Sequence, residues 1–384
     1  MKYFFSFFFI VLSSLPLSTG TQEIVEDRQE ILKAEVVEII SNTSEKIPGT
    51  DTLHTVQSIK AKILEGASKG EIVALDNDYI DLKIGTTFYL KKITPWDGGT
   101  IMYSVFEPYR IPALFILTIL FIILTIIFGG KQGVRGLLSL FGSFALIAFV
   151  LLPAITHGYS PVLVSIGVSS LIVVLGSYVT HGFNKTTSAA VLGMILTISF
   201  IGIFAHISIG GAQLSGFETE EATYLHFNTR GTIDLPGLLL GGILIGLLGV
   251  MYDAAIGQAI SVEELHRVAP HLPRKTIYKR AIRIGREHIG ALVNTLAIAY
   301  VGASLPLLLL FYSSTTESAL VIANREIFAT EIVRSLVGSI GLILAVPITT
   351  LVATWMLIKN TEAIDPKTLL AEEKAIEHAG HHHS

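Results

Sequence analysis

The sequence predicts a membrane protein in which a small all-β extracytoplasmic domain precedes an all-α bundle of about seven transmembrane helices. Three observations support this fold class. Of the 384 residues, 51% are hydrophobic and only 15% are charged, whereas soluble domains carry about a quarter charged residues. Several apolar segments beyond residue 109 are long enough to cross a bilayer. Residues 21–109 contain no such segment and show short strands separated by turn residues.

The amino-terminal segment has the parts of a secretory signal peptide. Lys2 gives a positive start, residues 3–17 are apolar, and residues 18–20 are small enough to suit cleavage. The alternative is an uncleaved anchor helix, which we disfavour because the apolar run is short for a span. We therefore expect a signal peptide over residues 1–20, and we expect the domain after it to lie outside the cell.

Residues 21–109 are predicted to form a small β-barrel or sandwich of OB-like or SH3-like type. Asp76, Asp78 and Asp81 lie close together but lack the spacing of a calcium loop, so we expect a solvated turn there. Nothing in the domain has a catalytic pattern. Its expected strands cover residues 34–40, 71–75, 79–84 and 87–92.

The transmembrane domain is predicted at residues 110–359, with a cytoplasmic tail at 360–384. The loops after the first, third and fifth spans are basic, whereas the loops on the opposite side are mainly acidic. This positive-inside bias agrees with the export signal, so the β domain is expected outside and the carboxyl terminus inside. The expected spans are residues 111–128, 136–155, 161–180, 187–209, 235–259, 290–312 and 333–358.

The fifth span carries a stripe of small residues that includes one acid. Its members recur every three or four residues and therefore share one helix face. The stripe consists of Gly242, Gly246, Gly249, Asp253 and Gly257. Small residues allow close helix packing, so we expect this face to point into the bundle. An acid at membrane depth is costly, which favours proton or cation handling by Asp253; the alternatives are a structural hydrogen-bond acceptor or a wetted interface group.

The position of Asp253 along the membrane normal suggests which other residues lie beside it on a transport pathway. Asp253 lies about 28 Å inward of the outer end of its span, at 1.5 Å per residue. Asn294 and Thr295 lie about one turn into the sixth span from the inner side, so we expect contact among the three residues. Pro347 is predicted to open a kink whose freed carbonyls line a cavity, although a tolerated proline without function is equally consistent. The pathway candidates beside that proline are Thr349 and Thr350.

The basic loop after the fifth span is predicted to form a short amphipathic helix. Apolar positions recur on one face, and basic residues surround them. Such a helix suits the surface of an anionic inner leaflet, and a docking site for a soluble partner is the alternative. The basic residues are Arg274, Lys275, Lys279, Arg280, Arg283 and Arg286.

Several functions are disfavoured by the residues present. A net charge of −4 argues against nucleic acid as a partner. The absence of cysteine excludes disulfides, thiolate metal sites and a cysteine nucleophile. A single Glu263-x-x-His266 pair in a loop does not make a metal site. Because no nucleophile elbow, zinc helix or phosphate loop occurs, we predict neither an enzyme nor a bound cofactor.

Short motifs spread along the chain resemble the YibE/F-like family of bacterial multi-pass membrane proteins. The resemblance implies a location in the bacterial cytoplasmic membrane and brings no agreed substrate or cofactor. The chain departs from the family pattern at Glu287 and His288, which leaves the role of His288 open. The matching motifs are residues 65–71, 129–133, 152–158, 241–253, 284–286, 294–296, 299–302, 324–326, 331–332 and 346–347.

Two functions are consistent with these features. The first is a transporter or permease of a small solute or ion, linked to protons or cations through Asp253; similar Leu-Pro pairs at 152–153 and 305–306 suggest parallel repeats. The second is a membrane-anchored scaffold or sensor whose extracytoplasmic domain binds a protein partner, because a simple permease does not require that domain.

Overall fold

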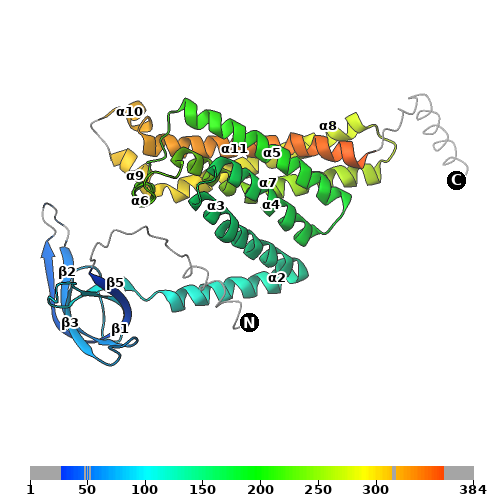
Figure 1. Ribbon diagram of the computed structural model, residues 1–384. Coiled ribbons are helices and arrows are strands. Elements are labelled where there is room, and N and C mark those ends of the chain that lie inside the picture. Colours follow the sequence, from blue (N-terminus) through cyan, green and yellow to red (C-terminus); the bar gives the residue numbers. More distant parts are fainter. Residues whose placement is uncertain (1–26, 47–48, 50, 52, 314–316, 359–384) are drawn as a thin grey trace, which may run out of the picture. The chain divides into compact units, whose positions relative to one another are not determined.

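The computed structural model describes residues 27–46, 49, 51, 53–313 and 317–358. The expected signal peptide at 1–20 and the whole of the expected cytoplasmic tail at 360–384 lie outside the described residues, so neither expectation is tested. The chain divides into two compact units, Met1–Leu124 and Thr125–Ser384. A five-stranded sheet makes up most of the first unit and helices make up the second (Figure 1).

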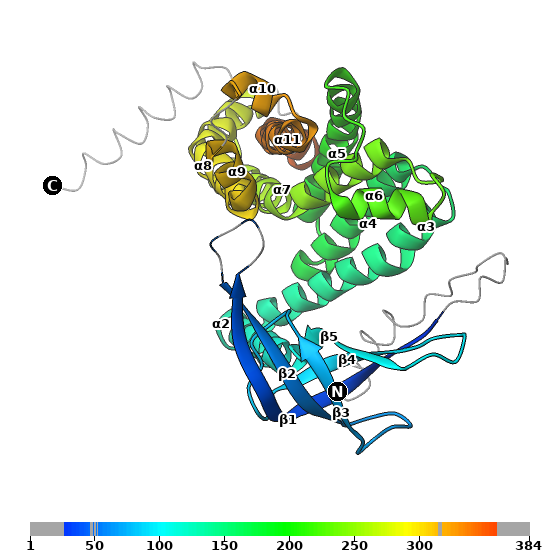
Figure 2. The ribbon, with the colours of Figure 1, turned by 90° about the vertical axis from the view of Figure 1, so that its left-hand side faces the viewer.

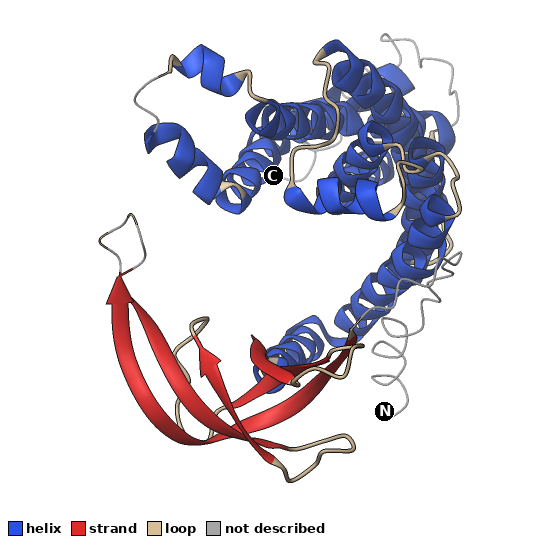
Figure 3. Ribbon diagram, turned by 60° about the vertical axis from the view of Figure 1, so that its left-hand side comes forward, coloured by secondary structure: helices blue, strands red, loops and turns tan. Residues whose placement is uncertain are grey.

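The first unit contains one antiparallel sheet with the strand order β3-β2-β1-β4-β5. The long β1 pairs through its first half with β4 and through its second half with β2. The two outermost strands, β3 and β5, also approach each other, and the sheet is strongly curved (Figure 3). The strands are β1 (Arg28–Lys46), β2 (Leu53–Ile63), β3 (Ile72–Asn77), β4 (Thr87–Thr94) and β5 (Met102–Pro108).

A strand expected at 79–84 is instead a loop, and the reason is a pair of buried amides. The Gln57 side chain accepts a hydrogen bond from the Leu82 backbone N–H at 2.9 Å and donates to the Leu82 carbonyl at 3.0 Å. Asn77 donates to Gln57 and to the carbonyl of Ile80. These side chains satisfy the backbone groups that a neighbouring strand would otherwise pair. Asp81 accepts a hydrogen bond from Gln57. Among the described residues, no cluster of three or more acidic or histidine side chains could hold a metal ion.

Within the part of the chain that the structure describes, the helical region contains five helices long and apolar enough to cross a membrane, which indicates a membrane protein. A sixth candidate is the pair α8 and α9, which bend by 69° at Ser304. The region comprises α2 (Ile111–Leu146), η1 (Ile147–Leu151), α3 (Leu152–Thr156), α4 (Pro161–His181), α5 (Lys185–Gly211), α6 (Glu220–Asn228), α7 (Leu235–Val268), α8 (Arg274–Ala303), α9 (Leu305–Ser313), α10 (Ala319–Ala323) and α11 (Glu326–Leu357).

The first two expected spans are joined in one helical stretch, Ile111–Thr156, which is 46 residues long. It is interrupted at Gly130, whose φ of 53° and ψ of −135° are not helical. Glycine reaches this backbone conformation without the clash that a Cβ would cause. The break falls in the glycine-rich segment where the sequence predicted a loop.

The core of the second unit lies where α5, α7 and α11 pack together, with α4 and α8 against them (Figure 2). Small residues set the closest approaches between these helices. A Cβ on Gly193 of α5 would lie 2.6 Å from the Thr349 hydroxyl oxygen of α11, and one on Gly341 would lie 2.6 Å from Leu247 of α7. The helices can therefore approach this closely only because both positions are glycine.

Candidate functional site

The glycine face of α7 is not packed inside the bundle, contrary to the expectation from sequence. Gly242, Gly246, Gly249, Asp253 and Gly257 are all exposed on the described chain. The opposite face carries large apolar side chains and is buried, and it includes Leu240, Ile243, Leu244, Leu247 and Met251. Large apolar side chains make many more van der Waals contacts with neighbouring helices than glycine does, so packing within the chain buries the leucine face.

Asp253 lies near the end of α4 in the same unit. His181, the last residue of α4, is close enough for the two charges to interact. The ring of His181 is 5.9 Å from that of Tyr252, and the Tyr252 hydroxyl donates to the Gly176 carbonyl at 3.4 Å. The acid is therefore placed beside a titratable imidazole where α4 meets α7.

A cavity of about 310 Å³ opens beside these residues, at the end of the bundle where α7 ends and α8 begins. We call this the basic end. His181 and Glu263 line the cavity, and the Thr186 hydroxyl donates to the Glu263 carboxylate at 2.7 Å. Asn184 accepts from the Thr187 N–H and so caps α5 at the same place. The cavity is thus lined by these polar side chains together with Ile256 and Ile260 of α7.

The companions predicted for Asp253 lie elsewhere. Asn294 is exposed and lies two residues from buried Leu296, which places it on the opposite face of α8. The Thr295 hydroxyl donates to its own helix, at the carbonyl of Ala291. Among the described residues, no hydrogen bond or ion pair joins either side chain to Asp253, so the structure does not bring the expected set together.

Thr349 and Thr350 are fully buried in a helix contact. Thr349 packs against Gly193, and the Thr350 hydroxyl donates to the Val346 carbonyl at 2.7 Å. Helix α11 continues through Pro347 from Glu326 to Leu357. Neither threonine lines either of the two cavities described in this section.

The basic segment after α7 is the start of α8 and not a separate surface helix. Ile277, Ala281 and Gly285 are buried, and Gln258 of α7 donates to the Ala281 carbonyl at 2.7 Å. Arg274 donates to the carbonyl of Ile358 at 2.6 Å and so caps the end of α11. The other basic residues of the predicted patch, Lys275, Lys279, Arg280, Arg283 and Arg286, are exposed.

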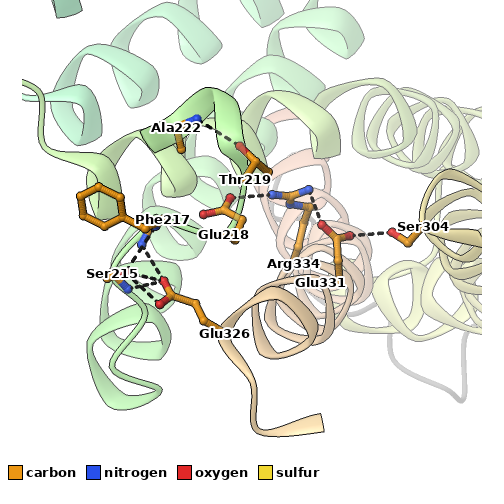
Figure 4. A network of polar contacts seen from close by, with 10 residues as sticks. Ser215, Phe217, Glu218, Thr219, Ala222, Ser304, Glu326, Glu331 and Arg334 are labelled. Atoms are coloured by element: carbon orange, nitrogen blue, oxygen red, sulfur yellow. Dashed lines mark hydrogen bonds and ion pairs between the residues drawn. The ribbon is translucent and has the colours of Figure 1, made fainter. Parts of the chain in front are cut away.

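At the opposite end of the bundle, where α7 and α11 begin, charged side chains meet (Figure 4). We call this the acidic end. Arg334 of α11 donates to Glu331 at 2.7 Å and lies 3.5 Å from Glu218, which precedes α6. Glu331 also accepts from the Ser304 hydroxyl at 3.0 Å. This cluster was missed from sequence, although one arginine inside an apolar span was a usable signal.

A second contact at the acidic end fixes the loop before α6. The Glu326 carboxylate accepts hydrogen bonds from the backbone N–H groups of Ser215 and Gly216, at 2.6 and 2.9 Å, and from the Ser215 hydroxyl (Figure 4). Glu326 is also in the first turn of α11, where a negative charge is favourable. The loop that carries Glu218 is therefore held against α11.

The charged cluster meets the break between α8 and α9. Ser304, which bonds to Glu331, is the residue at the bend. Pro306 has no N–H, so it cannot bond to the carbonyl of Gly302 as a helix would require. One turn earlier, the buried Tyr300 hydroxyl has no hydrogen-bond partner among the described groups. The tyrosine lies against Gly246 of α7 and Gly338 of α11.

A cavity of about 260 Å³ lies at this acidic end. The cluster residues Glu218 and Arg334 line it together with Gly242 of the α7 glycine face. The glycine face therefore has an ionisable group near each end, Arg334 at the acidic end and Asp253 towards the basic end.

Comparison with known proteins gives one result for this region. A family model described as YibE/F-like protein matches residues 117–359. The match covers the helices and more than half of the chain, but it leaves out the five strands. No curated protein and no solved structure matches the chain.

Proposed function

This chain belongs to the YibE/F-like family, and we propose that it is a multi-pass membrane transporter or permease for a small solute or ion. One observation carries the proposal: ionisable side chains gather at the break between α8 and α9, in a bundle built mainly from long apolar helices. Irregular backbone and charges are tolerated at membrane depth mainly where they line a cavity or pathway. Broken helices of this kind form the binding sites of many secondary transporters.

In this proposal the chain crosses the membrane seven times. The five long helices and the bent pair make six (5 + 1). The stretch Ile111–Thr156 would measure about 69 Å if straight, more than twice the hydrocarbon thickness. Dividing it at Gly130 gives two crossings and seven spans in total (6 + 1). The expected signal peptide and the positive-inside bias of the loops support a β domain on the outer side of a bacterial cytoplasmic membrane and a carboxyl terminus in the cytoplasm.

The proposed pathway follows the glycine face of α7. It runs from the acidic-end cavity past Gly246 and Tyr300 to Asp253 and the basic-end cavity. Glycine leaves room along the face, since a Cβ on Gly242 or Gly249 would meet no other atom within 4 Å. Asp253, beside His181, is the group we assign to proton or cation coupling.

Flux through proteoliposomes tests this function. The full chain is reconstituted with a trapped pH-sensitive dye, and proton movement is followed under imposed Na⁺, K⁺ or potential gradients. Asp253→Asn is expected to reduce flux at least tenfold, because the amide cannot exchange a proton. Glu220→Gln, an exposed change outside both cavities, serves as the control. Full flux in Asp253→Asn would contradict the coupling role.

A scaffold or sensor is the second candidate, and the first unit favours it. Its core forms a self-contained cluster, and several large apolar side chains remain exposed, including Ile84, Trp96 and Phe106. We propose an OB-like barrel here, because β3 and β5 approach to close the five-stranded sheet. Deleting residues 27–108 should then release a co-purifying protein, and flux should be absent from the intact chain.

A further inference from the structure

The acidic-end cavity is lined by both polar and apolar side chains. The polar ones, which we call the polar wall, are Glu218, Thr219, Glu221 and Arg334. The apolar ones, which we call the apolar wall, include Leu225 of α6 and Leu235, Leu238 and Leu239 from the first turns of α7. A ligand that fits this cavity must therefore join a polar head to an apolar body.

The polar wall favours a positive head. The Glu218 side chain is only 12% exposed, and its Oε2 is buried without a hydrogen-bond partner among the described groups. Its Oε1 lies 3.5 Å from Arg334, whereas Arg334 bonds to Glu331 at 2.7 Å. The arginine is thus engaged more closely elsewhere, and Glu218 keeps an oxygen that a donor could satisfy. A buried carboxylate oxygen without a donor is costly, so binding a cation there is favourable.

The cavity limits the size of the ligand. Its volume of about 260 Å³ lies below the range of roughly 300–1,000 Å³ typical of drug-sized ligands. A head group with a short hydrocarbon chain fills such a space.

We propose that this cavity binds a small organic cation, with its ammonium group on Glu218 and its hydrocarbon part against the α7 leucines. This names the substrate class of the transport activity proposed above and rests on that proposal only for turnover. An organic anion is disfavoured, because it would meet two carboxylates and an arginine already bound to Glu331. A bare metal ion is disfavoured by the apolar wall.

Calorimetry on the full chain in detergent tests the binding, with n-butylammonium as the probe. Butyrate and n-butanol have the same hydrocarbon chain but a negative or neutral head. Butylammonium is expected to bind, and the other two are expected to bind at least tenfold more weakly. Absence of butylammonium binding, or equal binding of butyrate or butanol, would overturn the proposal.

Three variants locate the site. Glu218→Gln is expected to weaken butylammonium binding at least tenfold, while Glu220→Gln, two residues away and outside the cavity, leaves it unchanged. Gly242→Leu should also abolish binding, because position 242 lines the cavity and a Cβ added there meets no other atom within 4 Å, which leaves the leucine side chain free to fill the cavity. Gel filtration checks that each variant is folded. If Glu218→Gln aggregates, butylammonium binding by Gly242→Leu becomes the test of the site. Unchanged binding in either folded variant overturns the proposal.

The experiments distinguish a failure of the proposed binding site from a failure of the proposed transport function. Butylammonium that binds at Glu218 but does not cross proteoliposome membranes would leave the cavity assignment intact and count against the transporter. Proton or metal-ion flux that depends on Asp253, without any butylammonium binding, would support the transporter and overturn the substrate class.

Discussion

The two units differ in how they treat buried polar side chains. In the β unit, Gln57 and Asn77 are almost fully buried, and they bond to each other and to the backbone of the loop beside them. In the helical unit, several buried hydroxyl oxygens have no partner among the described groups. These belong to Ser165, Ser169, Thr330 and Thr349.

The difference separates two uses of polarity. A bonded amide pair holds a loop in place, so removing it should cost stability. Small hydroxyl residues between apolar helices chiefly permit close packing, so removing one hydroxyl should cost little. The charged groups near the cavities form a third class, for which binding or flux is the informative measurement.

The largest effect is expected for Gln57→Ala. The change removes the side chain that bonds to Asn77, Asp81 and both backbone groups of Leu82. Leaving these groups unsatisfied in a buried site should lower the free energy of unfolding of the β unit by about 2–4 kcal/mol. Urea unfolding followed by Trp96 fluorescence, in a Trp355→Phe background, measures this because the chain has only two tryptophans.

Gln29→Ala is the matched control for Gln57→Ala. Gln29 is exposed on β1, so its loss should change stability by less than about 0.5 kcal/mol. Similar losses in the two variants would show that the buried amide pair has no special structural role.

The second effect compares two glycines of the helical unit. In Gly193→Ala the new Cβ would lie 2.6 Å from the Thr349 hydroxyl oxygen and 2.8 Å from its Cα, so α5 and α11 must separate. Overpacking of this kind costs about 1–3 kcal/mol. In Gly249→Ala the Cβ meets nothing within 4 Å, and the better helix former should change stability by no more than about 1 kcal/mol.

Thermal unfolding in detergent compares the two variants with the unchanged chain. A large loss in Gly249→Ala would mean that another surface covers the glycine face of α7 in solution. Equal and small effects at both positions would instead argue against the close contact between α5 and α11.

Local patterns predicted part of this structure. Long apolar runs located the helices, and turn residues separated three of the expected strands from their neighbours. The expected strand at 79–84 failed because its backbone partners are side chains on Gln57 and Asn77, which no local pattern reveals. We expected the glycine face of α7 to be buried because small residues allow close packing, but the leucines on the opposite face make more van der Waals contacts within the bundle.

The acidic-end cluster is held together by contacts between residues that are far apart in the sequence, so local patterns could not predict it. Glu326 bonds to Ser215, which lies 111 residues away, and Arg334 pairs with Glu218 from a different loop. The identities of Glu218 and Glu326 alone would indicate exposed loop charges, whereas Arg334, inside an apolar span, was a usable signal. Only the Leu305-Pro306 pair carried a local signal of the helix break, because proline interrupts helix bonding.

The smallest effect is expected for Thr349→Val, and it tests whether the unbonded hydroxyls differ in kind from the amide pair. Valine keeps the branched shape and replaces an oxygen that has no partner among the described groups. Thermal stability should therefore stay within about 0.5 kcal/mol or rise slightly. Flux should also be unchanged, because Thr349 packs against Gly193 and lines neither cavity. A loss as large as that of Gln57→Ala would imply a hydrogen bond to water or solute at Thr349. A selective loss of flux would return Thr349 to the pathway.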